Sequence, residues 1–362
     1  MKHSSAIVTQ AKPSDQPLAY WNPSPLTQRR IDIFLNNKRA KWSLWLFALM
    51  LTLSLCSPII ANDKPLVIQY KQSFFFPIFN AYPETTFGGD FETTTDYTDP
   101  YIIALIEKNG WLIWPLIPYH YTTHIRNLTS PAPSSPSSSH WLGTDDQARD
   151  VLARTLYGLR VSLLFAIGLT FGSSLIGITI GAFQGYFGGT IDLIGQRFLE
   201  LWSGLPTVYL LIIISSIITP NTAWLLFIML LFSWTRLVDL VRAECLKVRN
   251  LDYIKAARAL GVSHIKIIQR HLLPNAMVAT IAYMPFILAG AISTLTALDF
   301  LGLGLPPGSA SLGELVLQGK NNLHAPWLGL TAFVTLSSTL TLMVFIGEGA
   351  RDAFDPRLKV ST

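Results

Sequence analysis

Six apolar stretches, each long enough to cross a lipid bilayer as a helix, constrain the fold of this chain more than any other feature. They cover residues 42–60, 161–183, 201–219, 223–241, 272–298 and 325–347. About 20 residues of helix span the roughly 30 Å of hydrocarbon in a bilayer. Only 14% of the 362 residues are charged, whereas about a quarter are charged in an average soluble domain. The sequence therefore predicts an all-α membrane protein with six transmembrane helices and both termini on the same side.

Charged residues are distributed unevenly, and their distribution predicts the orientation of the chain. Basic residues dominate the segment 236–270 and the N-terminal tail, where they are Lys2, Lys12, Arg29, Arg30, Lys38, Arg39 and Lys41. Acidic residues outnumber basic ones in 62–150. Because short loops rich in Lys and Arg stay in the cytoplasm, we expect both termini and the segment 250–275 there, and the acidic segment outside.

The composition divides the chain into five parts. We expect a cytoplasmic tail at 1–41, a first transmembrane helix at 42–60, an external insert with a Ser/Pro linker at 61–139, a five-helix core at 140–350 and a cytoplasmic tail at 351–362. The insert is rich in aromatic residues, which indicates a compact unit or one that lies on the mouth of the core. A docking surface for an external partner and a small packed appendage are both open interpretations of this insert.

The segment 250–275 has the pattern of two short helices separated by a turn. Asn250 and Ser263 can cap the two helices, and Gly261 suits a turn that needs left-handed geometry. Lys255 and Arg258 are expected to face away from the apolar side of the first helix. The apolar stripes are Ile254, Ala257 and Leu260 in the first helix, and Ile265, Ile268 and Leu272 in the second. Such a pair can fit a groove on a soluble partner and transmit rigid-body motion, or can bind only lipid headgroups.

The spacing in this segment resembles the coupling motif of binding-protein-dependent ABC importers, which is Glu-Ala-Ala, three residues, Gly, nine residues and Ile-x-Leu-Pro. The matching positions are Lys255, Ala256, Ala257, Gly261, His271, Leu273 and Pro274. Lys255 replaces the acid of the motif and His271 replaces its isoleucine. The resemblance implies that these residues, together with Tyr253, couple the chain to a separate ATPase subunit. Ala256 and Ala257 suit close approach of another surface, and Pro274 is expected to mark the entry to the fifth span from its position alone.

Other segments resemble dipeptide and oligopeptide permeases of the same importers. They are 141–162, 185–189 with Asp192 and Arg197 as a first cytoplasmic loop, 299–307 after the fifth span, and the tail 351–357. The stretches 82–90 and 300–327 look most like the Yej-type permeases, which import oligopeptides and the peptide–nucleotide antibiotic microcin C.

This resemblance implies a type I ABC importer permease fold in a multi-pass protein of the bacterial inner membrane. The chain would be a non-catalytic subunit that forms half of a path for oligopeptides and works by alternating access. Its implied partners are a second homologous permease, two ABC ATPase subunits, a periplasmic substrate-binding protein, the peptide and the lipid bilayer, with no nucleic acid. A permease for another solute such as nickel, a secondary transporter, an intramembrane enzyme and a membrane scaffold are the alternatives.

No nucleotide or metal site is expected in this chain. The stretch 313–320 superficially resembles a phosphate loop, but its spacing is one residue too long and Asn321 stands where Ser or Thr is required. The seven histidines show no ligand spacing. We therefore expect no cofactor in this chain and ATP bound by separate subunits.

Charged and small residues within the spans have a structural and a functional interpretation. Arg236 and Asp239 can line a pore, although an interfacial ion pair three residues apart is the favoured interpretation. Asp299 is expected to be a structural cap or gate rather than a ligand for substrate. The small residues of the second span, which allow helices to approach closely, are Gly168, Gly172, Ser173, Ser174, Gly177 and Gly181.

Overall fold

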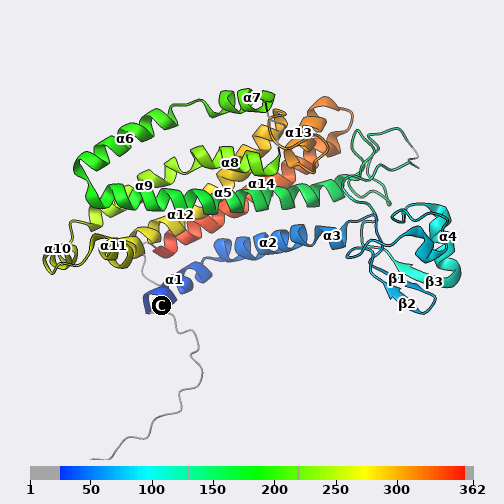
Figure 1. Ribbon diagram of the computed structural model, residues 1–362, viewed down its shortest axis with the longest axis horizontal. Helices are drawn as coiled ribbons and strands as arrows, with labels where there is room; N and C mark the ends of the chain where they lie inside the picture. Colours follow the sequence, from blue (N-terminus) through cyan, green and yellow to red (C-terminus); the bar gives the residue numbers. More distant parts are fainter. Residues whose placement is uncertain (1–24, 127, 129, 218–220, 355–362) are drawn as a thin grey trace, which may run out of the picture.

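The computed structural model describes residues 25–126, 128, 130–217 and 221–354, and it is predominantly helical (Figure 1). Parts of the two predicted cytoplasmic tails, 1–24 and 355–362, lie outside the described residues. The helices run along one long bundle, with a small separate unit at one end (Figure 1). We call this the insert end and the opposite end, where helix α10 lies, the α10 end.

Four long apolar helical units form the centre of the bundle. They are α5 (Val151–Phe187), α8 (Thr222–Ser233) with α9 (Thr235–Val248), α11 (His264–Ile267) with α12 (Leu273–Phe300), and α14 (Pro326–Phe354). Each unit is long and apolar enough to cross a membrane. In the described part of the chain, a bent pair of helices brings the number of such spans to at most five.

Small residues let α5 and α9 pack closely, as the sequence predicts. A Cβ atom added at Gly181 would lie 2.8 Å from the Val238 carbonyl oxygen, and one at Gly177 would lie 2.9 Å from the Trp234 carbonyl oxygen. Larger side chains at these positions would therefore push the two helices apart.

The predicted third span is broken. Helix α6 (Gly189–Ser203) and helix α7 (Thr207–Ile217) meet at an angle of 62°. Pro206 follows Leu205 at the break, and a proline disfavours helical geometry in the residue before it. The segment 185–197, expected as a loop, is helical except for a turn at Gly188, whose φ is 61°. The connection between α5 and α6 is therefore a tight turn at Gly188, shorter than the expected loop.

The first predicted span corresponds to α2 (Lys38–Leu55) followed by α3 (Ser57–Ile60). Its first turn carries Lys38, Arg39 and Lys41, so the helix does not qualify as a span by its composition. Helix α2 nevertheless packs along α14 over much of the bundle (Figure 1). The preceding helix α1 (Pro25–Asn36) also contacts α14.

The insert contains β-structure, which the all-α prediction did not include. Strand β1 (Val67–Tyr70) pairs antiparallel with β2 (Ser73–Phe75) on one side and β3 (Gly110–Ile113) on the other. Helix α4 (Pro100–Asn109) and the 3-10 turn Glu84–Phe87 cover the sheet. The rings predicted to make a compact unit do so, because Phe87 lies fully buried among Ile68, Tyr70, Tyr97, Ile102 and Ile106.

Candidate functional site

The candidate site is the helical segment at the α10 end of the bundle. Helix α9 ends there, and α10 (Asp252–Ala259) follows as a helix of two turns. Leu251 occupies its N-cap position without a side-chain hydrogen bond. Asn250 donates instead to the Leu246 carbonyl oxygen at 3.2 Å. The predicted cap at Asn250 was therefore wrong, because this side chain closes the end of the preceding helix.

The turn after α10 has the left-handed geometry that the sequence predicts. Gly261 has a φ of 76°. Its N–H donates to the Arg258 carbonyl oxygen at 3.0 Å. The N–H of Val262 donates to the Ala257 carbonyl oxygen at 3.1 Å. These two bonds form a Schellman motif, which requires a residue that tolerates positive φ.

The second predicted short helix is not a separate element. Helix α11 passes through a π-helical turn, Ile268–Leu272, directly into α12, so that His264–Phe300 is one continuous unit. Pro274 lies in the first turn of α12 and does not interrupt it. A proline cannot donate the usual helical bond and crowds the preceding turn, and the wider π-helical turn accommodates it. Ser263 stands at the N-cap position of α11 but makes no side-chain cap bond.

One face of this segment is anchored in the bundle. Ile254, Ile267 and Leu272 are fully buried and pack with Tyr186 of α5 and Cys245 of α9. Burying one such aliphatic side chain contributes roughly 1.5–3 kcal/mol. Helix α10 is therefore held against the ends of three long helices.

The predicted apolar stripes are only partly buried. Leu260 is 83% exposed and Ile265 is 69% exposed, whereas Ile254 and Leu272 of the same stripes are fully buried. The chain turns away from the bundle directly after α10, which leaves Leu260 outside. Ile267, which the predicted stripe omitted, takes the inner position.

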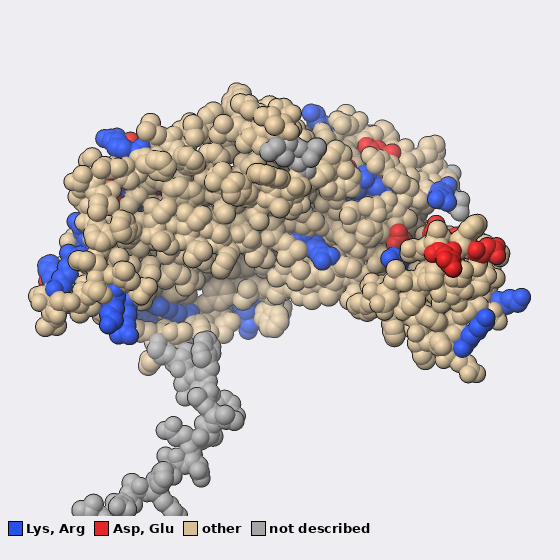
Figure 2. All heavy atoms as spheres, in the orientation of Figure 1, with Lys and Arg blue, Asp and Glu red and all other residues tan. Residues whose placement is uncertain are grey.

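Basic side chains are exposed on the same segment as these two aliphatic residues. Figure 2 shows Lys and Arg gathered over α10 and α11. The exposed basic residues of this segment are Lys255, Arg258, Lys266 and Arg270. Lys255 Nζ lies 3.2 Å from the Asp252 carboxylate, and the Arg258 guanidinium lies 4.5 Å from the centre of the Tyr186 ring. The exposed part of this segment thus carries both apolar and positively charged side chains, which suits an acidic protein surface.

The remaining predicted coupling residues divide between the two faces. Tyr253 accepts a hydrogen bond from Asn275, and its ring lies 6.2 Å from that of His271. Ala256 and Pro274 are exposed, whereas Leu273 is half-buried. Ala257 is only 9% exposed, so it allows α10 to approach the bundle rather than an outside surface to approach α10.

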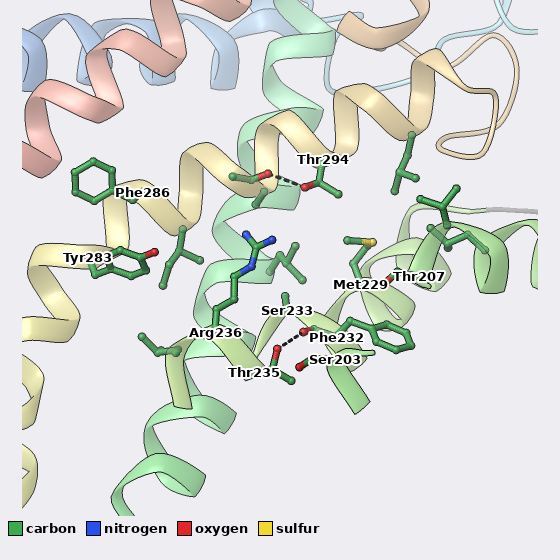
Figure 3. A pocket seen from close by; sticks show the side chains of 18 residues that line it. Ser203, Thr207, Met229, Phe232, Ser233, Thr235, Arg236, Tyr283, Phe286 and Thr294 are labelled. Carbon is green, nitrogen blue, oxygen red and sulfur yellow. Dashed lines mark hydrogen bonds between the residues drawn. The ribbon is translucent and has the colours of Figure 1, made fainter. Parts of the chain in front are cut away.

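A cavity of about 370 Å³ lies deeper in the bundle, and Arg236 from the start of α9 lines it (Figure 3). The expected ion pair between Arg236 and Asp239 is not formed among the described residues. Instead, Arg242 makes two hydrogen bonds to the Asp192 carboxylate, which lies in α6. Arg236 therefore lines this cavity and does not form the favoured interfacial pair.

A buried charged cluster at the insert end was missed by sequence reasoning. Arg154 is fully buried in α5, and its Nη2 lies 2.9 Å from Glu314 of α13 (Leu312–Asn321). Arg149 bridges Asp145 and Glu314, at 2.7 and 3.2 Å. The segment 141–162 contains Asp145, Arg149 and Arg154, but nothing in the sequence indicates that Glu314 lies beside them.

The neighbouring carboxylates at this end have structural roles. Asp150 caps α5 by accepting from the Ala153 N–H at 2.9 Å, and His140 lies 3.1 Å from it. Burial raises the pKa of Asp150, and these hydrogen bonds oppose the rise. Asp299 accepts hydrogen bonds from the Leu305 N–H and the Ser311 hydroxyl, as expected for a cap.

The stretch 313–320, which superficially resembles a phosphate loop in sequence, is part of helix α13. Gly313 and Lys320 both lie within it. A Cβ atom at Gly319 would lie 2.5 Å from the backbone nitrogen of Gly329 in α14. This stretch therefore packs helix on helix, a geometry unlike a loop that wraps phosphate.

A known protein family matches the part of the chain that contains the candidate site. The family model for the binding-protein-dependent transport system inner membrane component matches residues 177–360, which include all of α10 to α12. The chain is 55% identical over 337 residues to the inner membrane ABC transporter permease protein YejE of Escherichia coli, covering 93% of this chain and 99% of that protein.

Two further relatives carry names that describe a transported substance. The peptidoglycan transport system permease protein YejE of Agrobacterium fabrum is 52% identical over 358 residues, covering 92% of this chain and 94% of that protein. The oligopeptide transport system permease protein OppC of Haemophilus influenzae is 35% identical over 259 residues, covering 71% of this chain and 81% of that protein. These names give no support to the nickel alternative.

Proposed function

On the basis that this chain belongs to the family of binding-protein-dependent transport system inner membrane components, we propose that it forms half of the membrane path of an ATP-driven peptide importer. Like the other members of this family, it is a non-catalytic transmembrane subunit. The observation that carries the proposal is the unbroken helical unit His264–Phe300, which connects the exposed face of the α10 end to the interior of the bundle.

The coupling step follows from this continuity. An ATPase subunit binds Leu260, Ile265 and the basic residues around them, and its closure on ATP moves α10. Because α10 is packed onto α11 and the start of α12, the motion reaches α12 as a rigid-body shift. Helix α12 contributes Tyr283, Phe286 and Thr294 to the central cavity, so its movement changes the shape of the path. This is alternating access by movement of packed helices.

The proposed site residues act in two ways. Tyr253, Ala257, His271 and Leu273 hold α10 against the bundle. Lys255 and Ala256 lie on the exposed side, while Gly261 and Pro274 set the backbone geometry between the helices.

The proposed topology has six spans, with both termini and α10 in the cytoplasm and the insert in the periplasm. The course of α2 supports the sixth span, because it begins toward the α10 end and leads through α3 into the insert (Figure 1). The charge distribution supports the orientation, since Asp and Glu gather toward the insert end in Figure 2.

The complete transporter in this proposal contains a second homologous permease, two ATPase subunits and a periplasmic substrate-binding protein. Large apolar side chains are exposed along α6 and α7, including Leu193, Ile194, Leu201, Tyr209 and Ile213. Such faces suit lipid or a second permease. Peptides are the proposed substrate, because the names of relatives point to oligopeptides and peptidoglycan. The resemblance to the Yej-type permeases extends the proposal to peptide–nucleotides of the microcin C type.

The test is growth of an auxotrophic bacterium that lacks its own peptide permeases. The chain is expressed with its cognate permease, ATPases and binding protein, and a tripeptide is the only source of the required amino acid. We expect growth that disappears when the ATPase subunits are inactivated by substitution. Growth that persists with inactive ATPases would indicate a secondary transporter, and uptake of radioactive nickel without growth on peptide would restore the nickel alternative.

A further inference from the structure

The central cavity combines a large apolar surface with a few polar groups and one cation. Its polar lining includes Ser203, Thr207, Tyr283 and Thr294, and Arg236 provides the charge (Figure 3). Its volume of about 370 Å³ falls within the roughly 300–1,000 Å³ of typical small-molecule sites. The cavity therefore has the size and lining of a binding site.

Arg236 is the first charged residue of the 27-residue unit Thr222–Val248, which is apolar enough to cross a membrane. It lies toward the proposed cytoplasmic end of the predicted span 223–241, and its side chain is exposed. A charged side chain within a membrane-spanning segment is unfavourable unless it faces water or a partner, and it commonly marks a substrate pathway. In Figure 3 the guanidinium points into the cavity, between α12 and α8.

The described part of the chain provides no anion for this guanidinium. The cavity lining contains no carboxylate. Asp239 lies three residues further along α9 and makes no ion pair with Arg236, and Asp192 is bound by Arg242. The charge of Arg236 is thus available to a group that enters the cavity.

We propose that Arg236 binds the C-terminal carboxylate of a peptide as the peptide passes through the cavity. A guanidinium presents parallel N–H donors that match the oxygens of a carboxylate, and the hydroxyl groups nearby can complete its hydrogen bonds. This inference rests on the proposed function and specifies which group of the substrate the path recognises.

The rest of the lining explains how such a site tolerates many sequences. Met229, Phe232 and Phe286 contribute apolar surface around the cation. Methionine adapts its shape to different neighbours, and apolar walls discriminate weakly between hydrophobic groups. Every unmodified peptide carries a terminal carboxylate whatever its sequence, and this is the one of its two terminal groups that is an anion. Recognition by Arg236 therefore selects the class of substrate without selecting its sequence.

The experiment compares a tripeptide with its C-terminal amide in proteoliposomes that contain the complete transporter and its binding protein. The variant Arg236→Gln removes the charge. We expect it to slow import of the free acid by about tenfold or more, the effect of losing hydrogen bonds to a charged group, and to leave import of the amide nearly unchanged. The binding protein is identical in every assay, so the change in the ratio of the two rates reports on this chain.

Two further variants keep the test decisive. Arg236→Lys retains the charge without the paired donors, and we expect it to keep part of the preference for the acid even if Arg236→Gln assembles poorly. Arg197→Gln removes an exposed arginine that pairs with Glu200, and it should not change the ratio.

Three results would overturn the inference. An unchanged ratio in Arg236→Gln would mean that the arginine does not bind the carboxylate. An equal loss of both peptides, with poor assembly of the complex, would mean that it pairs with an acid of the second permease. If the wild-type transporter imported neither peptide, the proposed function would be wrong and this inference would fall with it.

Discussion

Asn275 donates a hydrogen bond to the hydroxyl of Tyr253, with 3.2 Å between Nδ2 and Oη. The same amide group donates to the His271 carbonyl oxygen at 2.8 Å. The first bond joins α10 to the first turn of α12, and the second holds the Asn275 side chain against the preceding helical turn. Together with the buried Ile254 and Ile267, they make α10 and the long helix a single mechanical unit.

Tyr253→Phe tests this connection, because it removes the hydroxyl and keeps the ring. A hydrogen bond of this kind contributes about 0.5–1.5 kcal/mol, so the complex should still assemble. We expect more ATP to be hydrolysed per peptide imported, by up to about tenfold, when both are measured in proteoliposomes. The matched control is Tyr209→Phe, at a 68% exposed tyrosine of α7. Equal coupling ratios in the two variants would show that the hydrogen bond plays no part.

Gly261→Pro should abolish import while the protein still inserts into the membrane. Proline fixes φ near −65°, whereas Gly261 has a φ of 76° and donates its N–H to the Arg258 carbonyl oxygen. Gly261→Ala is the control, since alanine keeps the N–H and its Cβ would meet no atom within 4 Å. Its cost is that of left-handed geometry, about 1–2 kcal/mol, so most uptake should remain. Normal uptake by Gly261→Pro would contradict the coupling role of the turn.

Arg154→Met should strongly destabilise the insert end of the bundle. The guanidinium is fully buried between Asp145 and Glu314, and breaking a buried ion pair by removing one partner costs about 3–5 kcal/mol. The control is Arg197→Met, which breaks a pair whose side chains are 70% and 59% exposed. Exposed pairs contribute about 0–1 kcal/mol. Thermal unfolding in detergent should show a clear fall in Tm for Arg154→Met alone, and similar Tm values would refute a stabilising role for the cluster.

The ring of His120 in the insert lies 5.0 Å from the ring of Tyr157 in α5, and this contact should loosen in mild acid. Burial lowers the pKa of His120 from 6.5, nearby Asp63 opposes this change, and Lys64 adds to it. The folded state therefore disfavours the protonated ring, so stability is complete above pH 6.5 and declines as the pH falls through the lower pKa of the folded state. Hydrogen exchange of residues 119–123 should increase over that range and should change less in His120→Gln. The same pH dependence in both proteins would show that another group is responsible.

The sequence predicts those features that depend on local geometry. Gly261 follows a helical stripe, and left-handed geometry could be assigned to it from that position alone. Gly177 and Gly181 likewise indicate close helix packing, because their spacing places them on one helix face. Apolar length identifies the four long units, which agree with the predicted spans apart from their ends.

Features that depend on tertiary packing could not be predicted in this way. Leu260 continues the helical pattern of Ile254 and Ala257, but it is exposed because the chain turns away from the bundle. Pro274 indicates a helix start by local rules, yet a π-helical turn carries the helix through it. Glu314 joins the cluster around Arg154 from a helix more than 150 residues later, and no local pattern encodes that contact.

Disulfide cross-linking from Leu260 tests the central claim most directly. Both native cysteines, Cys56 and Cys245, are first replaced. Leu260→Cys is then compared with Leu323→Cys. The two leucines are 83% and 84% exposed and lie in different parts of the chain. With cysteines placed on the co-expressed ATPase subunits, we expect Leu260→Cys to cross-link to them with a yield that changes on adding ATP, and Leu323→Cys to give no product. Cross-linking of the ATPase subunits to Leu323→Cys and not to Leu260→Cys would contradict the account.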